Sequence, residues 1–152
     1  MRAGHRQGAQ LLNAQDDHLR EETVASETVF AGRLLEVRRD RIRLPDGGEA
    51  TREFIVHPGA VMVVPILDDG RLVMERQWRS PLARVMLKFP AGKLEPGEPT
   101  LACAQRELFE ETGYRAAQWA LAGVLHNAIA YSNERIEIWF ARGLAAGERR
   151  LD

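Results

Sequence analysis

The sequence predicts an α+β fold, with a mixed β-sheet packed against one helix and an antiparallel β unit before it. Three stretches of the chain support this fold class. Residues 100–112 are rich in helix formers, residues 60–67 form a continuous apolar run, and residues 134–141 alternate between polar and apolar side chains. The continuous run is typical of a strand buried on both faces, and the alternation of a strand with one buried face. A length of 152 residues is enough for one core of useful size.

The helix is expected from about Thr100 to Thr112. Pro99 suits its first turn, where a missing N–H costs nothing, and Gly113 suits the position that ends a helix. One stripe of the helix should face the core, and its members are Leu101, Ala104, Leu108 and Thr112. The lone cysteine, Cys103, is expected to be a small packing residue.

The remaining elements are expected to be strands. Between the N-terminal unit and the tail, these lie at residues 60–67, 71–77, 85–89, 117–126 and 134–141. Residues 143–152 form a polar tail. The predicted organisation has a poorly ordered segment at 1–26, two or three antiparallel strands at 27–56, and the core domain at 57–152. A small antiparallel unit is marginally stable alone and needs a packing partner.

Composition narrows the function. A formal net charge of −1 argues against nonspecific nucleic-acid binding, which requires a basic surface. A single cysteine cannot form an internal disulfide, as in proteins of a reducing compartment. No apolar run approaches the roughly 20 residues of a membrane span, and the N-terminus lacks a signal-peptide pattern. We therefore expect a soluble cytoplasmic protein with neither a nucleic-acid nor a membrane partner.

The predicted helix carries an unusual concentration of negative charge. Glu107 and Glu111 are four residues apart and share one strip, and Glu110 lies beside them. Like charges at this spacing cost a few tenths of a kcal/mol per pair, and a hard divalent cation would offset that cost. A solvated acidic helix face is the alternative. Under the metal hypothesis, Glu107→Gln and Glu111→Gln should reduce turnover without lowering metal-free stability.

Residues 92–114 read GKLEPGEPTLACAQRELFEETGY. A glycine is followed after five residues by Glu98 and, after seven more, by the run that starts at Arg106 and ends at Gly113. This spacing resembles the Nudix box, although Tyr114 stands where an aliphatic residue is usual. The resemblance implies the Nudix fold. It also implies a hydrolase that cleaves a nucleoside diphosphate linked to another group, using Mg²⁺, with Mn²⁺ as an alternative.

The resemblance also implies roles for individual residues. The expected metal ligands are Glu107, Glu111, Glu110 and the backbone carbonyl of Ala91. Arg106 is expected to orient a box carboxylate, and with the three glutamates it completes the catalytic set. Gly92 and Glu98 are expected to fix the loop before the helix.

Within the Nudix family, the chain is most similar to the ADP-ribose pyrophosphatase group. The stretches that carry this similarity are Arg52-Glu53, His57–Ala60, Arg76–Pro81, Phe89–Lys93 and Tyr131–Arg135. Two positions depart from the group: Ile129 stands in place of a common proline, and Lys88 in place of a common acidic residue.

The similarity to this group implies a substrate and a partner. The substrate would be ADP-ribose, cleaved to AMP and ribose 5-phosphate. Arg52, Arg79 and Glu134 are candidate substrate-binding residues, with ordinary surface positions as the alternative. The N-terminal strands would contribute to a homodimer.

Other readings remain open. The substrate could be a GDP-sugar, a dinucleoside polyphosphate, FAD or a damaged nucleotide, or the chain could be a ligand-sensing Nudix module without activity. In the ADP-ribose group a glutamate on a late loop is thought to act as general base. The tail offers only Glu148 and Asp152, so we expect slow turnover unless Glu111 or Glu110 accepts the proton itself. A positioned base contributes typically 10²–10⁴-fold.

Overall fold

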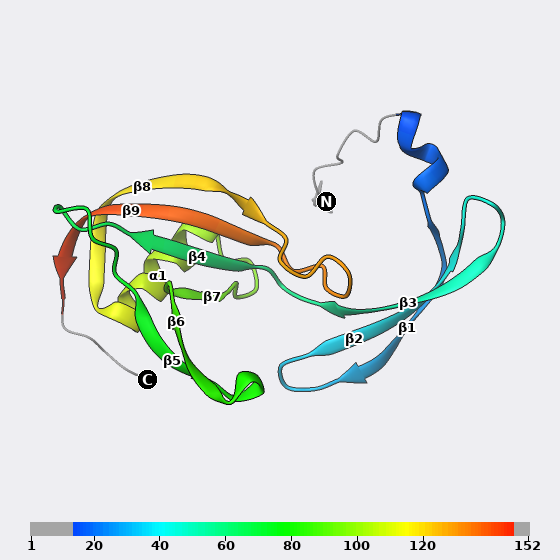
Figure 1. Ribbon diagram of the computed structural model, residues 1–152, viewed down its shortest axis with the longest axis horizontal. Helices are drawn as coiled ribbons and strands as arrows, with labels where there is room; N and C mark the ends of the chain where they lie inside the picture. The colour runs from blue at the N-terminus through cyan, green and yellow to red at the C-terminus, as the bar shows by residue number, and fades with distance from the viewer. Residues whose placement is uncertain (1–13, 148–152) are drawn as a thin grey trace, which may run out of the picture. The chain divides into compact units, whose positions relative to one another are not determined.

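The computed structural model describes residues 14–147 and divides the chain into two units, Met1–Ile55 and Val56–Asp152 (Figure 1). The first described element is a 3-10 helix, η1, at Ala14–Leu19. Strand β1 follows at Glu22–Ala31, so regular structure begins before residue 27. This corrects the expectation of a poorly ordered segment that extends to residue 26. Its first thirteen residues lie outside the described part of the chain.

The first unit is a three-stranded sheet in the order β1-β2-β3. Strand β2 spans Glu36–Arg43 and pairs antiparallel with β1, and β3 spans Glu49–Val56. Arginine–glutamate pairs connect the strands; Arg39, for example, lies 2.9 Å from Glu53 and 3.4 Å from Glu27. These pairs are exposed and contribute little stability. All of β1 is exposed apart from one half-buried residue, so this sheet has very little core of its own.

The second unit contains a mixed four-stranded sheet in the order β7-β4-β9-β8. Its strands are β4 (Ala60–Pro65), β7 (Ala91–Lys93), β8 (Tyr114–Leu125) and β9 (Ile136–Ala146). Strand β4 runs parallel to β9 and antiparallel to β7, and β8 runs antiparallel to β9. The central position of β4 explains its continuous apolar sequence. A separate two-stranded sheet joins β5 (Glu75–Arg79) to β6 (Arg84–Lys88), with a short 3-10 turn, η2, at Ser80–Leu82 between them.

Helix α1 spans Thr100–Thr112, as predicted. Gly113 ends it in the left-handed conformation, with φ 76°, and donates its N–H to the carbonyl of Phe109. A residue with a side chain would be strained in this conformation. Pro99 occupies the position just before the first helical residue, and its carbonyl accepts the N–H of Cys103 at 3.0 Å. The proline therefore stands one position earlier than predicted.

The core of the second unit lies between α1 and the four-stranded sheet (Figure 1). Its fully buried members are Val61, Val63, Cys103, Ala104, Leu108 and Ala141. Cys103 has the packing role expected of it. Leu101 and Thr112, at the ends of the predicted stripe, are only half-buried. Burial of these side chains holds the helix against the sheet, so the face that carries the glutamates has a fixed direction.

The predicted boundaries of two strands differ most from those observed. The strand expected at 71–77 lies instead at Glu75–Arg79, where it pairs with β6. Strand β9 continues to Ala146, through residues expected to be a polar tail, because Tyr114 at the start of β8 pairs with Ala146. Within residues 14–147, no helix is long and apolar enough to cross a membrane.

Candidate active site

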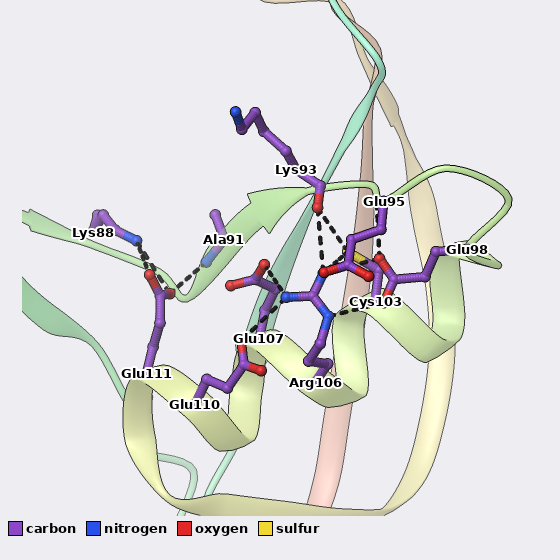
Figure 2. A network of polar contacts seen from close by, with 10 residues as sticks. All are labelled: Lys88, Ala91, Lys93, Glu95, Glu98, Cys103, Arg106, Glu107, Glu110 and Glu111. Carbon is purple, nitrogen blue, oxygen red and sulfur yellow. Dashed lines mark hydrogen bonds and ion pairs between the residues drawn. The ribbon is translucent and has the colours of Figure 1, made fainter. Parts of the chain in front are cut away.

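Arg106 connects the acidic side chains of α1 with the loop that precedes the helix (Figure 2). Its Nε and Nη2 donate to the two carboxylate oxygens of Glu98, each at 2.9 Å. Its Nη1 donates to Glu107 at 2.7 Å and to Glu110 at 3.1 Å. A further donor reaches the carbonyl oxygen of Lys93 in β7 at 3.3 Å. A planar guanidinium can satisfy this many acceptors at once, which a lysine ammonium cannot do with the same geometry.

Glu98 connects the loop to the helix. Besides the two bonds from Arg106, its carboxylate accepts the backbone N–H of Glu95 at 3.1 Å. The hydrogen bonds from Arg106 and from Glu95 lower the pKa of Glu98 to about 2, from an ordinary 4.5. The same carboxylate, with Glu107, raises the pKa of Arg106. The pair is therefore charged at all ordinary pH values, which agrees with the proposed loop-fixing role of Glu98.

Gly92 lies directly beside the carboxylate of Glu107. A Cβ atom placed on Gly92 would lie 1.8 Å from Oε1 of Glu107 and 1.9 Å from its Cδ. No side chain fits in that space while Glu107 keeps its position. Gly92 in β7 therefore leaves room for the carboxylate of Glu107, which projects from α1. Its expected effect on the loop is joined by this effect on the position of the carboxylate.

Glu111 is held on the other side of the helix face by different partners. Its Oε2 accepts the backbone N–H of Ala91 at 2.8 Å, and its Oε1 lies 3.0 Å from the ammonium of Lys88 (Figure 2). Lys88 also forms an ion pair with Glu75 of β5. The side chains of Lys88, Glu75 and Glu111 are 14%, 17% and 20% exposed. This burial raises the pKa of Glu111, while the Ala91 and Lys88 hydrogen bonds act in the opposite direction.

These positions exclude a simple solvated acidic face. The side chain of Glu107 is 12% exposed and that of Glu111 is 20% exposed, and each contacts a cation of the protein. The side chain of Glu110, at 42%, is the most exposed of the three.

The donor chemistry of this face fits Mg²⁺. Three carboxylates and the backbone oxygens of β7 are hard ligands of the kind that Mg²⁺ and Mn²⁺ prefer. The space that Gly92 leaves for Glu107 supports the same reading. Among residues 14–147, no three acidic, histidine or cysteine side chains are grouped as a ligand set, because the carboxylates here turn toward Arg106 and Lys88. Binding of a metal ion would therefore require the carboxylates to turn from these partners.

A comparison with protein-family models matches residues 56–151 to the NUDIX domain. The chain belongs to the Nudix family. Residues 21–55 match a second model, the nucleoside diphosphate sugar hydrolase N-terminal domain. The two matches meet at the boundary between the two structural units. Within the Nudix domain, the predicted box is the segment that carries Gly92, Glu98, Arg106 and the three glutamates, and the chain is a Nudix pyrophosphohydrolase.

Relatives with assigned names support the same family. The ADP-ribose pyrophosphatase of Bacillus subtilis (strain 168) is 36% identical over 134 residues, which cover 88% of this chain and 72% of the relative. The ADP-ribose pyrophosphatase of Mycobacterium tuberculosis (strain ATCC 25618 / H37Rv) is 40% identical over 124 residues, 81% of this chain and 60% of the relative. A solved structure described as an ADP compounds hydrolase superposes with a TM-score of 0.77 at 29% identity, covering 87% of this chain and 73% of that one.

The three candidate substrate-binding residues lie apart from the box in the sequence, and each has its own surroundings in the structure. Arg52 belongs to the first unit, where it pairs with Glu21 at 3.2 Å through Nε. Arg79 ends β5, is exposed, and forms no ion pair within the described residues 14–147. Glu134 lies 3.6 Å from Nε2 of His57, and the two side chains are 22% and 17% exposed. Their contacts with a substrate remain predictions.

Sequence reasoning missed Glu75 and gave no role to Lys88. The position of Lys88 in the sequence could have indicated a role, because it places a cation where an acidic residue is common in the ADP-ribose pyrophosphatase group. Glu75 had no such signal, since its position depends on the pairing of β5 with β6, where Glu75 lies opposite Lys88. The candidate tail carboxylates, Glu148 and Asp152, lie outside the described residues.

Proposed function

We propose that this Nudix protein hydrolyses the pyrophosphate bond of a nucleoside diphosphate sugar in the presence of Mg²⁺, with ADP-ribose as the preferred substrate. The products would be AMP and ribose 5-phosphate. The observation that carries this proposal is the convergence of Glu98, Glu107 and Glu110 on Arg106, beside the glycine of β7. The choice of substrate is supported by the match of the N-terminal unit to a nucleoside diphosphate sugar hydrolase domain and by the names of the relatives.

The proposed ligands of Mg²⁺ are Glu107, Glu110, Glu111 and the carbonyl oxygen of Ala91. Bound there, the ion would neutralise phosphate charge and lower the pKa of the attacking water. Arg106 limits the motion of two of the carboxylates, and positioning of this kind supplies much of the acceleration in phosphoryl chemistry. Glu111 or Glu110 is our candidate for the group that accepts the proton from water.

The substrate is tested with a panel of compounds at fixed Mg²⁺ concentration. ADP-ribose should have the highest kcat/KM, above GDP-mannose, diadenosine polyphosphates, NADH and FAD. Release of AMP and ribose 5-phosphate is followed by chromatography. A higher kcat/KM for any other member would reassign the substrate but keep the enzyme class. Tight ADP-ribose binding without turnover at every Mg²⁺ and Mn²⁺ concentration would instead identify a sensing module.

We further propose that the first unit forms part of a homodimer. Five apolar side chains of this unit are at least 40% exposed in the single chain: Leu19, Val29, Phe30, Leu34 and Leu35. A three-stranded sheet with so little core gains stability from a packing partner. Sedimentation at micromolar concentration should give a dimer, and Phe30→Ser should weaken it. A compact monomer would exclude this proposal.

We propose a cytoplasmic location for the protein. Cys103, the single cysteine of the sequence, is buried and free. A protein without disulfides is suited to a reducing compartment. Fractionation of cells that express a tagged chain tests the location.

A further inference from the structure

The strongest unexplained feature of the Nudix unit is Lys88, which lies at the end of β6 between two acidic side chains. Its ammonium pairs with Glu75 of β5 and with Glu111 of α1. The three side chains are more than three-quarters buried. An ion pair in such surroundings is screened far less by solvent than a surface pair.

The two carboxylates are positioned by more than this ammonium. Glu111 also accepts the N–H of Ala91, which fixes its direction toward β7. Oε1 of Glu75 is buried and has no hydrogen bond of acceptable geometry within the described residues, so it contacts Lys88 as an ion pair only. Lys88 is therefore the one cation among the described residues that balances both carboxylates.

We propose that Lys88 is a positioning residue that keeps Glu111 paired and thereby lowers its affinity for a divalent cation. A charge of +1 at 3.0 Å from the carboxylate repels any metal ion that approaches the same oxygen atoms. Glu111 must also give up this contact in order to turn toward a metal. This inference rests on the proposed metal-binding role of Glu111, but it does not depend on which substrate is hydrolysed.

The structure separates this side of the helix face from the Arg106 side. Glu107 and Glu110 are held by Arg106, and Glu111 is held by Lys88 and Ala91 (Figure 2). A change at Lys88 should therefore alter metal binding through Glu111 and leave the hydrogen bonds of Arg106 intact. Lys93 provides the matched control, because its side chain is exposed and makes no ion pair with the described residues.

The test measures Mn²⁺ binding to the full chain without substrate, by electron paramagnetic resonance of free Mn²⁺ and by calorimetry. Lys88→Met should bind Mn²⁺ about tenfold more tightly than the unmodified protein, or bind an additional ion, because a positive charge has been removed. Lys88→Arg retains the charge and should stay within about threefold of the unmodified protein. Lys93→Met removes a lysine of β7 without freeing an acid, and should also stay within about threefold.

Two further variants make the outcome decisive. Lys88→Met with Glu111→Gln should lose the gain in Mn²⁺ affinity, whereas a gain that persists would show that Glu111 is not the group affected. If Lys88→Met unfolds because two carboxylates are left unbalanced, Mn²⁺ should restore its circular dichroism at concentrations that saturate the unmodified protein. Failure of Mn²⁺ to refold it would overturn the inference, as would equal or weaker Mn²⁺ binding by a folded Lys88→Met.

The ADP-ribose assay is run in parallel with these binding measurements. Tighter Mn²⁺ binding by Lys88→Met, together with no ADP-ribose hydrolysis by the unmodified protein, would reject the proposed function and keep the inference. Hydrolysis of ADP-ribose by the unmodified protein, together with unchanged Mn²⁺ affinity in Lys88→Met, would keep the proposed function and reject the inference.

Discussion

Gly92→Ala is the substitution that best separates function from folding at this site. The added methyl carbon would lie 1.8 Å from Oε1 of Glu107, well below the 3.0 Å under which Cβ contacts essentially never occur. The group in the way is the end of a flexible side chain, so Glu107 can move aside while the backbone stays in place. Gly92 does not have a positive φ, so alanine is not strained there.

The cost to stability can be worked from the contacts. On moving, Glu107 loses its 2.7 Å bond from Arg106, and a hydrogen bond to a charged group contributes about 1.5–3 kcal/mol. Replacing glycine by alanine stabilises the fold by about 0.4–1 kcal/mol, because the unfolded chain has less conformational entropy to lose. The net loss is about 0.5–2.5 kcal/mol, or roughly 1–10 °C in Tm at about 2–4 °C per kcal/mol for a chain of this size.

The cost to activity should be far larger. Displacing a proposed metal ligand should lower kcat/KM for ADP-ribose about 100-fold. In a Glu107→Gln background, Gly92→Ala should cause little further loss, because the two changes act on one group. Gly92→Ala with activity within about threefold of the unmodified protein would show that the glycine does not act through Glu107. Full additivity of the two losses would lead to the same conclusion.

Substitutions at four other residues test the hydrogen-bond network. Glu107→Gln and Glu111→Gln should each reduce Mg²⁺-dependent turnover about 100-fold. In metal-free thermal melts Glu107→Gln should lower Tm because Arg106 loses a charged partner, which revises the expectation from the sequence that metal-free stability would not fall. Glu111→Gln should leave Tm nearly unchanged, because burial disfavours that charge and Lys88 keeps its ion pair with Glu75. Arg106→Met should lower the free energy of unfolding by about 2–4 kcal/mol in urea titrations, and Arg106→Lys should restore less than half of it, since three carboxylates depend on one guanidinium. Glu98 has a folded pKa of about 2, below its ordinary 4.5. Its contribution to the free energy of unfolding is therefore fully present above pH 4.5 and is lost as the pH falls toward 2. Glu98→Gln should remove this component, about 1–2 kcal/mol after solvent screening, and parallel melting curves of the two proteins over this pH range would contradict it.

The elements whose signals are local could be predicted from the sequence alone. Helix α1 could be placed at Thr100–Thr112 because helix formers, a preceding proline and a terminal glycine all act within one or two turns. The central strand β4 was recognisable from its continuous apolar run. The spacing of the box residues identified the family, since residue types at fixed separations can be read without knowing any contact.

The partners of the charged groups could be identified only from the tertiary structure. The two alternatives for the acidic helix face, a metal site and a solvated surface, differ in how far the glutamates are buried. Their burial depends on β7, which lies against α1 because it pairs with β4. The role of Gly92 follows from that approach, because its open space is filled by a side chain fifteen positions later in the chain. The contacts of Lys88 with Glu75 and with Glu111 depend in the same way on strand pairing and helix packing. Long-range contacts of this kind leave no periodic pattern in a single sequence, so the ion pairs around Glu111 could be found only in the folded chain.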